Sequence, residues 1–446
     1  MTQQNMTFNW QKNGWPGAKV NRTALREELA AFAVALQRVK TAAEKPISQM
    51  AIANALVDEA MTTSAIEGVR VDETVIMSSI CRALGMKDVP QGFTKDVRSE
   101  GVAQMMLSVR ADWNKPISAG LIKAWHGALL ANDPREITIG EFRAHPVQVI
   151  RRDAYGEIEV VYEAPPCERV KAEISEFVAR WRRSVKGSDD IALKAAMLHP
   201  HFESIHPFED GNGRVGRALV SKVLAEGIGR PLILPVSTIV ARHRKDYYEE
   251  INAASKTLDW TPWAKFFIPV LTETLNDFVS ASAFVSAKAE YLKKYEPLMS
   301  ERAKAVIRRM FRDGSAGAAA GLSAAKWMRM TKMSKPTATR DLAELAATGA
   351  IIAENAASQT RYRLNFPFEG FDEPMNEPIV DGINDGINGE VYRLIAKNPG
   401  KRVPAFMAKL ELSRPTVERA IAALIKAGKI EHRGSKKTGG YWIRTK

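Results

Sequence analysis

Twelve residues, HPFEDGNGRVGR from His206 to Arg217, restrict the fold of this chain more than any other stretch. The run before them, IALKAAMLHPHFESI, is helical in pattern, and Pro207 disfavours helical backbone at the residue it follows, so that helix should end at His206. Gly211 and Gly213 permit a tight loop, and RVGRALVSKVLAEG then begins another helical run. The sequence therefore predicts two helices joined by a glycine-rich turn.

This turn has the residues of a phosphate site. A glycine-rich turn that enters a helix N-terminus exposes backbone N–H groups to an anion. Arg214 and Arg217 are three residues apart, so both guanidiniums can reach one side of the helix and hold a polyphosphate. Asp210 is unfavourable beside such an anion unless a Mg²⁺ ion lies between them. Histidine titrates near neutral pH, so His206 can deprotonate an attacking hydroxyl. The pattern indicates a nucleotide site, although the Walker sequence GxxxxGK[ST] is absent.

The same residues match the Fic family signature HPFx[D/E]GNGRxxR at every fixed position, and the chain therefore resembles that family. The resemblance implies an α-helical catalytic domain that transfers AMP from ATP to a Ser, Thr or Tyr hydroxyl of a protein and releases pyrophosphate. It implies that His206 is the general base and that Asp210 binds Mg²⁺. It assigns the α- and β-phosphates to the turn formed by Gly211, Asn212, Gly213 and Arg214. It assigns the γ-phosphate to Arg217.

The segment AIANALVDEAMTTSAIEGVRV (51–71) predicts a helix that stops at Gly68, with Thr63 and Glu67 on one face. A carboxylate at a helix C-terminus opposes the helix dipole, so Glu67 is either a solvated charge or has a cationic partner. The segment resembles the family's inhibitory motif [S/T]xxxE[G/N]. That resemblance implies that Glu67 pairs with Arg217 at the γ-phosphate position and keeps the resting activity low.

Two other stretches resemble family elements. GEFRAHPVQVI (140–150) resembles the flap, a hairpin whose edge binds the target by strand addition, and its expected docking residues are Gly140, Arg143, Val147 and Val149. DYYEEINAASKTLDWTPWAKFFIPVL (246–271) resembles the helices after the motif, with Tyr247 or Tyr248 beside the adenine. His199 and His201 have no zinc-helix spacing, which favours a structural role.

The C-terminal third contains an internal repeat, because MSKPTATRDLAELAATGAI (333–351) aligns with LSRPTVERAIAALIKAGKI (412–430). Each copy has the Ser-basic-Pro start and the glycine end of a capped helix. A shorter apolar helix precedes each copy and two strands follow it, an order that resembles the winged helix-turn-helix. Residues 297–446 hold 26 Lys and Arg against 15 Asp and Glu. This excess makes DNA a possible partner, with protein docking as the alternative, and the candidate contacts are Lys335, Arg340, Arg414, Arg419, Lys436 and Lys437.

The predicted fold is mainly α: a Fic helical domain with a small β-hairpin flap, followed by two winged-helix modules. The expected divisions are an N-terminal helical segment at 1–98 with the inhibitory helix at about 51–67, a catalytic domain at 99–280, modules at 297–365 and 389–446, and an acidic linker at 366–388.

No window of about 18 uncharged apolar residues occurs, and the N-terminus lacks a secretory pattern, so we expect a cytoplasmic protein without a membrane partner. Cys81 and Cys167 are too few for a disulfide framework and are expected to be small buried or half-buried thiols. The sequence leaves open whether the chain forms a homodimer.

The predicted function is an ATP- and Mg²⁺-dependent protein adenylyltransferase restrained by Glu67. Two alternatives remain: a DNA-binding regulator whose Fic domain senses nucleotide, or a Fic enzyme that transfers another nucleotide, such as UMP, or removes AMP.

Overall fold

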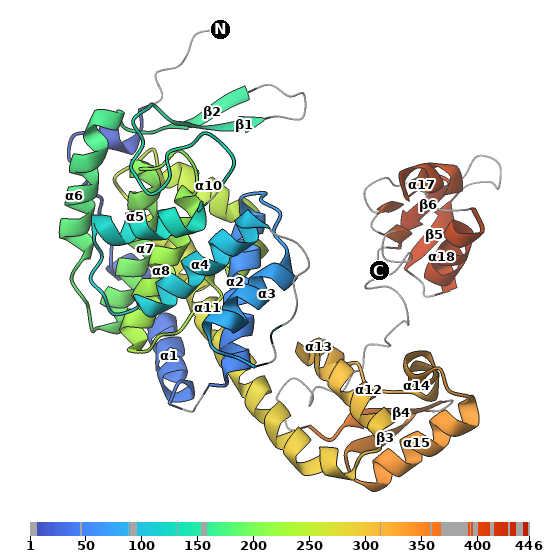
Figure 1. Cartoon of the computed structure of the whole chain (residues 1–446). Helices are drawn as coiled ribbons and strands as arrows, with labels where there is room; N and C mark the ends of the chain where they lie inside the picture. The colour runs from blue at the N-terminus through green and yellow to red at the C-terminus, as the bar shows by residue number, and fades with distance from the viewer. Residues whose placement is uncertain are drawn as a thin grey trace. The chain divides into compact units, whose positions relative to one another are not determined.

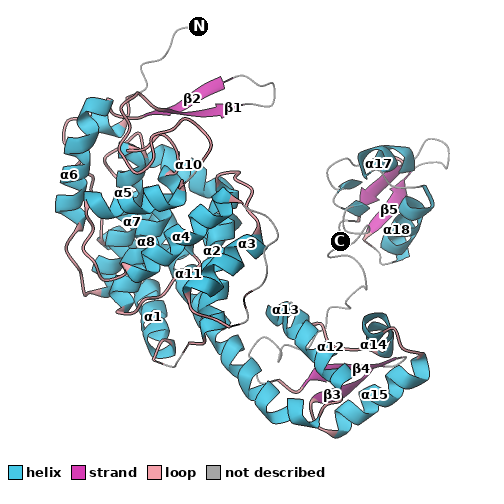
Figure 2. Ribbon diagram, viewed as in Figure 1, coloured by secondary structure: helices cyan, strands magenta, loops and turns pink. Residues whose placement is uncertain are grey.

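The computed structural model of this chain describes residues 7–444 apart from 45–46, 88, 90–95, 132, 153–157, 313, 357–358, 367–390, 393, 396–399, 411–413, 427–428 and 434–439. Most of the described chain is helical, and its strands form separate antiparallel pairs (Figure 2), which confirms the predicted mainly α class. The chain divides into two compact units, Met1–Phe368 and Glu369–Lys446 (Figure 1).

The first part of the first unit is a helical assembly with one strand pair. Its elements are η1 (Asn9–Gln11), η2 (Thr23–Leu25), α1 (Arg26–Ala42), α2 (Gln49–Ile66), α3 (Glu73–Ala83), α4 (Val97–Ala111), α5 (Ala119–Leu129), β1 (Gln148–Arg152), β2 (Ile158–Glu163), η3 (Cys167–Arg169), α6 (Val170–Trp181), α7 (Ser188–Ile205), α8 (Asn212–Ile228), α9 (Val236–Arg242), α10 (Arg244–Ala254) and α11 (Thr261–Tyr295).

Helices α7 and α8 are the two helices predicted on either side of the glycine-rich turn, and they pack against each other inside the assembly. Helix α7 is buried on nearly all sides after its first turn, polar side chains such as His199 and His201 included, and it contacts α1, α6 and α11 (Figure 1). It ends at His206, whose φ of 49° is left-handed. Gly211 has a φ of 84° and begins α8. This backbone fixes the turn between two rigid elements.

Helix α2 begins two residues before the predicted inhibitory helix and ends at Ile66. Gly68 has a φ of 72°, and the N–H of Val69 donates to the carbonyl of Ser64 at 2.9 Å, which is a Schellman stop. At the other end the Ser48 hydroxyl accepts from the N–H of Ala51. Both ends of α2 are therefore determined locally.

Helix α11 runs without a break for 35 residues, so the predicted domain limit at residue 280 falls inside it. Pro269 lies within the helix. The Thr272 hydroxyl donates to the carbonyl of Ile268 at 3.0 Å beside this proline. No glycine or proline occurs from residue 270 to 295, so no local residue ends the helix there.

The rest of the first unit contains η4 (Glu296–Leu298), α12 (Glu301–Arg312), α13 (Gly314–Ala319), α14 (Ala324–Thr331), α15 (Lys335–Ala347), β3 (Ile351–Ala356) and β4 (Gln359–Leu364). The described part of the second unit contains α17 (Val403–Leu410), α18 (Arg414–Lys426), β5 (Ile430–Arg433) and β6 (Gly440–Ile443). In each unit a helix that matches the repeat is followed by an antiparallel hairpin, in the predicted order. Phe366, which we assigned to the linker, is buried against Phe311.

Lys335 and Arg340 are exposed on α15, where Arg340 lies 3.9 Å from Glu344. The other candidate DNA contacts have side chains that lie outside the described residues: Arg414, Arg419, Lys436 and Lys437. Nucleic-acid binding therefore stays a prediction.

Cys81 is buried and Cys167 half-buried, and both are free thiols, as predicted. Across the described residues, none of the helices has the length and apolar character needed to cross a membrane.

Candidate nucleotide site

The backbone of the glycine-rich turn is fixed by Asn212. Its amide oxygen accepts from the N–H of Phe208 at 2.9 Å, and its amide nitrogen donates to the carbonyl of Phe208 at 2.8 Å. Both Asn212 and Phe208 are buried. An asparagine has the donor and the acceptor that this closed pair requires, so Asn212 shapes the turn that leads into the N-terminus of α8.

His126, which sequence reasoning did not identify, supports the same turn. Its ring stacks on Phe208 with centroids 3.8 Å apart. Nδ1 accepts from the N–H of Gly140 at 3.0 Å, so Nε2 carries the proton and donates to the carbonyl of Asp210 at 3.0 Å. Burial lowers the pKa of His126 to about 4, which keeps it neutral and suited to both roles. His126 thus joins the segment that begins the flap to the motif.

His206 lies at the end of α7 with 17% of its side chain exposed. Its Nδ1 lies 3.3 Å from the carbonyl oxygen of Glu203, which can only accept, so the proton is on Nδ1 and Nε2 keeps its lone pair. Burial lowers the pKa of His206 to about 4, with smaller opposing effects from the carbonyl of Glu203. A neutral imidazole with a free Nε2 is the form that a general base needs.

Asp210 is held by two arginines. It lies 3.1 Å from Nη2 of Arg214 and 2.7 Å from Nη2 of Arg135, and it also accepts from the N–H of Gly211 at 2.6 Å. Burial raises the pKa of Asp210, but Arg214 and Arg135 outweigh that effect and hold it below its usual value. Asp210 is therefore ionised. Arg135 is a second residue that sequence reasoning missed, because nothing near it in the sequence marks it as part of this site.

Arg217 and Glu67 form the ion pair that the inhibitory motif implied. Nη1 of Arg217 lies 2.8 Å from Oε1 of Glu67. The Nε of Arg217 donates to the Thr63 hydroxyl and its Nη2 to the Thr63 carbonyl, both at 3.0 Å. Arg217 is 1% exposed and the Glu67 side chain 30% exposed. A Cβ at Gly213 would collide with the Glu67 carboxylate, so the glycine provides the space in which that carboxylate lies.

Helix α10 holds the end of α2. Arg244 donates to the carbonyl of Ile66 at 2.8 Å, and the Tyr248 hydroxyl donates to the same oxygen at 3.2 Å. Tyr248 is 41% exposed, whereas Tyr247 is buried and its hydroxyl lies 2.8 Å from Nε2 of His199. Tyr248 is thus positioned beside the end of α2, and adenine contact by Tyr248 remains a prediction.

Arg143 anchors the flap. It is buried, and its side chain donates to the carbonyls of His206 at 2.8 Å, His145 at 3.0 Å and Pro165 at 2.5 Å. Its own N–H donates to the carbonyl of Pro207 at 2.9 Å. Arg143 therefore joins the flap to the motif through backbone carbonyls, and its part in target docking stays a prediction.

The flap itself is the β1–β2 hairpin, which pairs Val149 with Tyr162 and has a bulge after Val149. Val147 is half-buried, while Val149 and Ile150 are 38% and 48% exposed. Gly140 has a φ of 72°, a value that glycine adopts without strain. Within the described residues β1 pairs only with β2, so its other edge has backbone groups for an added strand.

His199 and His201 are buried within aromatic side chains, and Nδ1 of His201 accepts from the Trp181 indole at 2.9 Å. Burial lowers the pKa of each histidine to about 3. No cluster of three or more His, Cys, Asp and Glu side chains suited to a metal occurs in the described part of the chain. These contacts agree with the structural role predicted for both histidines.

Residues 116–224, which contain this turn, match the Fic/DOC family. The chain carries a Fic domain. Residues 8–86, which contain α2, match a domain of unknown function (DUF4172). Glu67 therefore lies outside the matched Fic segment, and its contact with Arg217 joins the two matched regions.

The Fic domain is similar to curated proteins of several organisms. A probable protein adenylyltransferase of Aquifex aeolicus is 32% identical over 93 residues, which are 21% of this chain and 27% of that protein. Protein adenylyltransferase Fic of Culex quinquefasciatus is 32% identical over 102 residues, 23% and 19% of the two chains. The Drosophila melanogaster protein of the same name is 29% identical over 164 residues, which are 36% of this chain and 30% of that protein. This chain thus spans less than a third of the length of these relatives.

Among solved structures, a Fic family protein from Desulfovibrio desulfuricans aligns with a TM-score of 0.49 and 21% identity over 76% of this chain and 95% of that one. Fic-1 (residues 134–508) from C. elegans aligns with a TM-score of 0.43 and 19% identity over 60% of this chain and 75% of that one.

Glu203 is another acidic side chain near the motif, in addition to Glu67, Glu209 and Asp210. Burial raises the pKa of Glu203 to about 8, and the nearby Glu67 carboxylate adds to the rise. Its Oε1 is buried without a hydrogen-bond partner within the described chain, against the backbone of Gly216. At pH 6 folded Glu203 therefore keeps a proton that the unfolded chain, with a pKa near 4.5, has lost.

We accordingly expect stability to fall as pH rises from about 4.5 to about 8, by up to about 1.4 kcal/mol per pH unit from this group. Glu203→Gln should remove that part of the slope. Denaturant unfolding at pH 5, 6.5 and 8 measures it, with exposed Glu249→Gln as the control. Equal slopes for all three proteins would show that Glu203 is ionised in the folded chain.

Proposed function

We propose that this protein is an ATP-dependent protein adenylyltransferase that transfers AMP to a Ser, Thr or Tyr hydroxyl and that Glu67 inhibits it. The observation that carries the proposal is one turn at which a neutral His206, an ionised Asp210 and a buried Arg217 come together at the N-terminus of α8. The names of the curated relatives support the same activity.

In the proposed reaction the target hydroxyl oxygen forms a bond to the α-phosphorus of ATP. The bond from that phosphorus to the bridging oxygen of the β-phosphate breaks, and its electron pair leaves on pyrophosphate. The hydroxyl proton moves to Nε2 of His206, which the contact of Nδ1 with the Glu203 carbonyl leaves available. The α8 N-terminus and Arg214 stabilise negative charge on the transferred group.

The donors present suit Mg²⁺ at Asp210. The carboxylate is ionised and 32% exposed, and Mg²⁺ at nucleotide sites is held by one or two carboxylates together with phosphate oxygens. A bound Mg²⁺ would neutralise charge on the phosphates. Asp210 would hold it after exchanging its present arginine contacts.

Inhibition by Glu67 follows from competition for one cation. Arg217 is the cation that the family resemblance assigns to the γ-phosphate, and Glu67 lies 2.8 Å from it. A γ-phosphate and the Glu67 carboxylate cannot both occupy the same face of a buried guanidinium, because like charges at that distance repel. ATP would then bind with its α-phosphate turned from the attacking hydroxyl.

The proposal has a direct test in the transfer of label from ATP to protein, because self-modification requires no identified target. Transfer of the α-label with no γ-label supports adenylylation. If label comes from UTP instead of ATP, another nucleotide is the substrate. If nucleotide binds but no label from any nucleotide is transferred, the nucleotide-sensing regulator is favoured.

A second proposal concerns the C-terminal modules, in which a helix is followed by an antiparallel hairpin twice. We propose that they bind duplex DNA through exposed cations such as Lys335 and Arg340. Phosphate neutralisation releases counterions, so affinity for a random duplex should fall about tenfold or more between 50 and 200 mM salt. Fluorescence anisotropy measures this. Salt-independent binding, or none, would leave protein docking as the role.

A further inference from the structure

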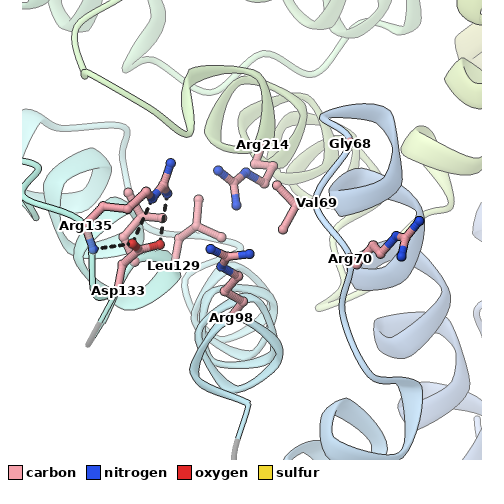
Figure 3. Close-up of a pocket in the computed structure, with 9 residues that line it drawn as sticks. Gly68, Val69, Arg70, Arg98, Leu129, Asp133, Arg135 and Arg214 are labelled. Carbon is pink, nitrogen blue, oxygen red and sulfur yellow. Dashed lines mark hydrogen bonds and ion pairs between the residues drawn. The ribbon is translucent and has the colours of Figure 1, made fainter.

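A pocket of about 310 Å³ lies beside the motif, and arginines dominate its lining (Figure 3). It is bounded by the segment after α2, by α4, by the end of α5 and the residues that follow it, and by α8. Figure 3 shows Arg98, Arg135 and Arg214 turned toward one another, whereas the guanidinium of Arg70 points away. Three guanidiniums from separate elements therefore face one small space.

Their charges are only partly compensated. Asp133 binds Arg135 through both oxygens, at 2.8 and 2.9 Å, and Asp210 is shared between Arg135 and Arg214. Among the described residues no carboxylate lies within ion-pair distance of Arg98. The three guanidiniums thus outnumber the two carboxylates that contact them.

Arg214 gives an independent sign of a ligand. Its side chain is 4% exposed, it lines the pocket, and its Nε is buried without a hydrogen-bond partner in the described chain. A buried guanidinium N–H without an acceptor is costly, so an anion that reaches the pocket gains a charge-assisted hydrogen bond there. The Nε–H of Arg214 lacks a hydrogen-bond acceptor, and Arg98 lacks a carboxylate partner among the described residues. A compact anion would supply both.

We propose that this pocket binds a diphosphate, with Arg98 and Arg135 as its specific residues and Arg214 as the link to the motif. The identity of the anion rests on the proposed function, since AMP transfer from ATP releases pyrophosphate. Guanidiniums bind phosphate oxygens in pairs, and a diphosphate offers oxygens to all three arginines at once. A diphosphate that accepts hydrogen bonds from Arg135 and Arg214 would replace Asp210 as their partner. The carboxylate oxygens of Asp210 would then be free of these contacts.

The residues that line the pocket are not those of the Glu67–Arg217 ion pair. Glu67 and Arg217 do not line it, although Gly68 and Val69 do. Arg98→Gln should therefore weaken pyrophosphate binding by the same factor in the wild type and in Glu67→Gly. If Arg217 alone held pyrophosphate, removal of Glu67 would strengthen binding and Arg98→Gln would change nothing.

Isothermal titration calorimetry, in which pyrophosphate is titrated into the full chain, measures the Kd that tests the proposal. Arg98→Gln is the decisive variant, because Arg98 is exposed and its replacement breaks no contact described here; Arg135→Gln is the second. Each should raise the Kd for pyrophosphate about tenfold. AMP, which lacks a diphosphate, should bind all variants equally. The matched control is Arg230→Gln, an exposed arginine just beyond the far end of α8, roughly 25 Å away by helix length.

Equal pyrophosphate affinity in wild type, Arg98→Gln and Arg230→Gln would overturn the proposal, as would the absence of pyrophosphate binding to the wild type. Transfer of α-label from ATP is measured on the same proteins. If label is transferred while Arg98→Gln leaves the Kd unchanged, the diphosphate site is wrong and the proposed function stands. If no label is transferred while the Kd rises tenfold, the diphosphate site stands and adenylylation does not.

Discussion

His206→Ala should lower the rate of AMP transfer about 10²–10⁴-fold, the usual contribution of a general base, and leave ATP affinity within about twofold. The imidazole is neutral because burial lowers its pKa to about 4, and its Nε2 has a free lone pair. Alanine removes that proton acceptor. The backbone that leads into α8 should be unaffected, since the Asn212 side chain fixes that turn. Single-turnover label transfer separates the chemical step from binding.

The matched control is His432→Ala, an exposed histidine of the second unit, which should transfer label at the wild-type rate. The measurement is best made in the background of Glu67→Gly, where a low resting rate does not hide the effect. A loss of ATP affinity equal to the loss of rate would assign His206 to nucleotide binding. An unchanged rate would remove it from the chemistry altogether.

Glu67→Gly should raise AMP transfer roughly 10- to 100-fold, within the range of measured coupling between sites. Among the described residues, its loss leaves the buried guanidinium of Arg217 with the two oxygens of Thr63 as hydrogen-bond partners, so a γ-phosphate becomes its natural counter-ion. ATP should then stabilise the variant against heat more than it stabilises the wild type. Initial rates of label transfer and melting with and without ATP measure both effects.

Glu44→Gly, at an exposed position after α1, controls for the removal of a carboxylate and should leave the rate unchanged. Glu67→Gln keeps the shape and loses the charge, so release by glutamine as well would assign the inhibition to electrostatics. If Glu67→Gly lowers the rate, Glu67 takes part in the reaction, as expected of an enzyme that removes AMP with a positioned water.

Features that depend on neighbouring residues could be predicted from the sequence. Pro207 ends α7, and Gly211 adopts the left-handed backbone that begins α8. Gly68 ends α2 in the same way, which presents Glu67 at a helix terminus. The contact between Glu67 and Arg217 came from the family resemblance, because the two residues are 150 positions apart and no local pattern connects them.

The residues that sequence reasoning missed all act through contacts distant in sequence. His126 is a single histidine in an apolar helix, and its role depends on Phe208 and Asp210, more than 80 residues away. Arg135 is one of many arginines until the fold brings it to Asp210. Arg143 was identified from its position in the flap motif, but its contacts with the carbonyls of His206 and Pro165 could not be predicted, because only the fold brings these residues together.

The most direct test of adenylylation uses ATP labelled on the α-phosphate or on the γ-phosphate, with Mg²⁺ and the Glu67→Gly protein. We predict that the protein acquires α-label alone, that pyrophosphate appears in equal amount, and that His206→Ala in the same background prevents both. Transfer of γ-label would show a kinase-type reaction instead. Binding of ATP without transfer of either label would contradict the proposed activity and leave a nucleotide-sensing domain.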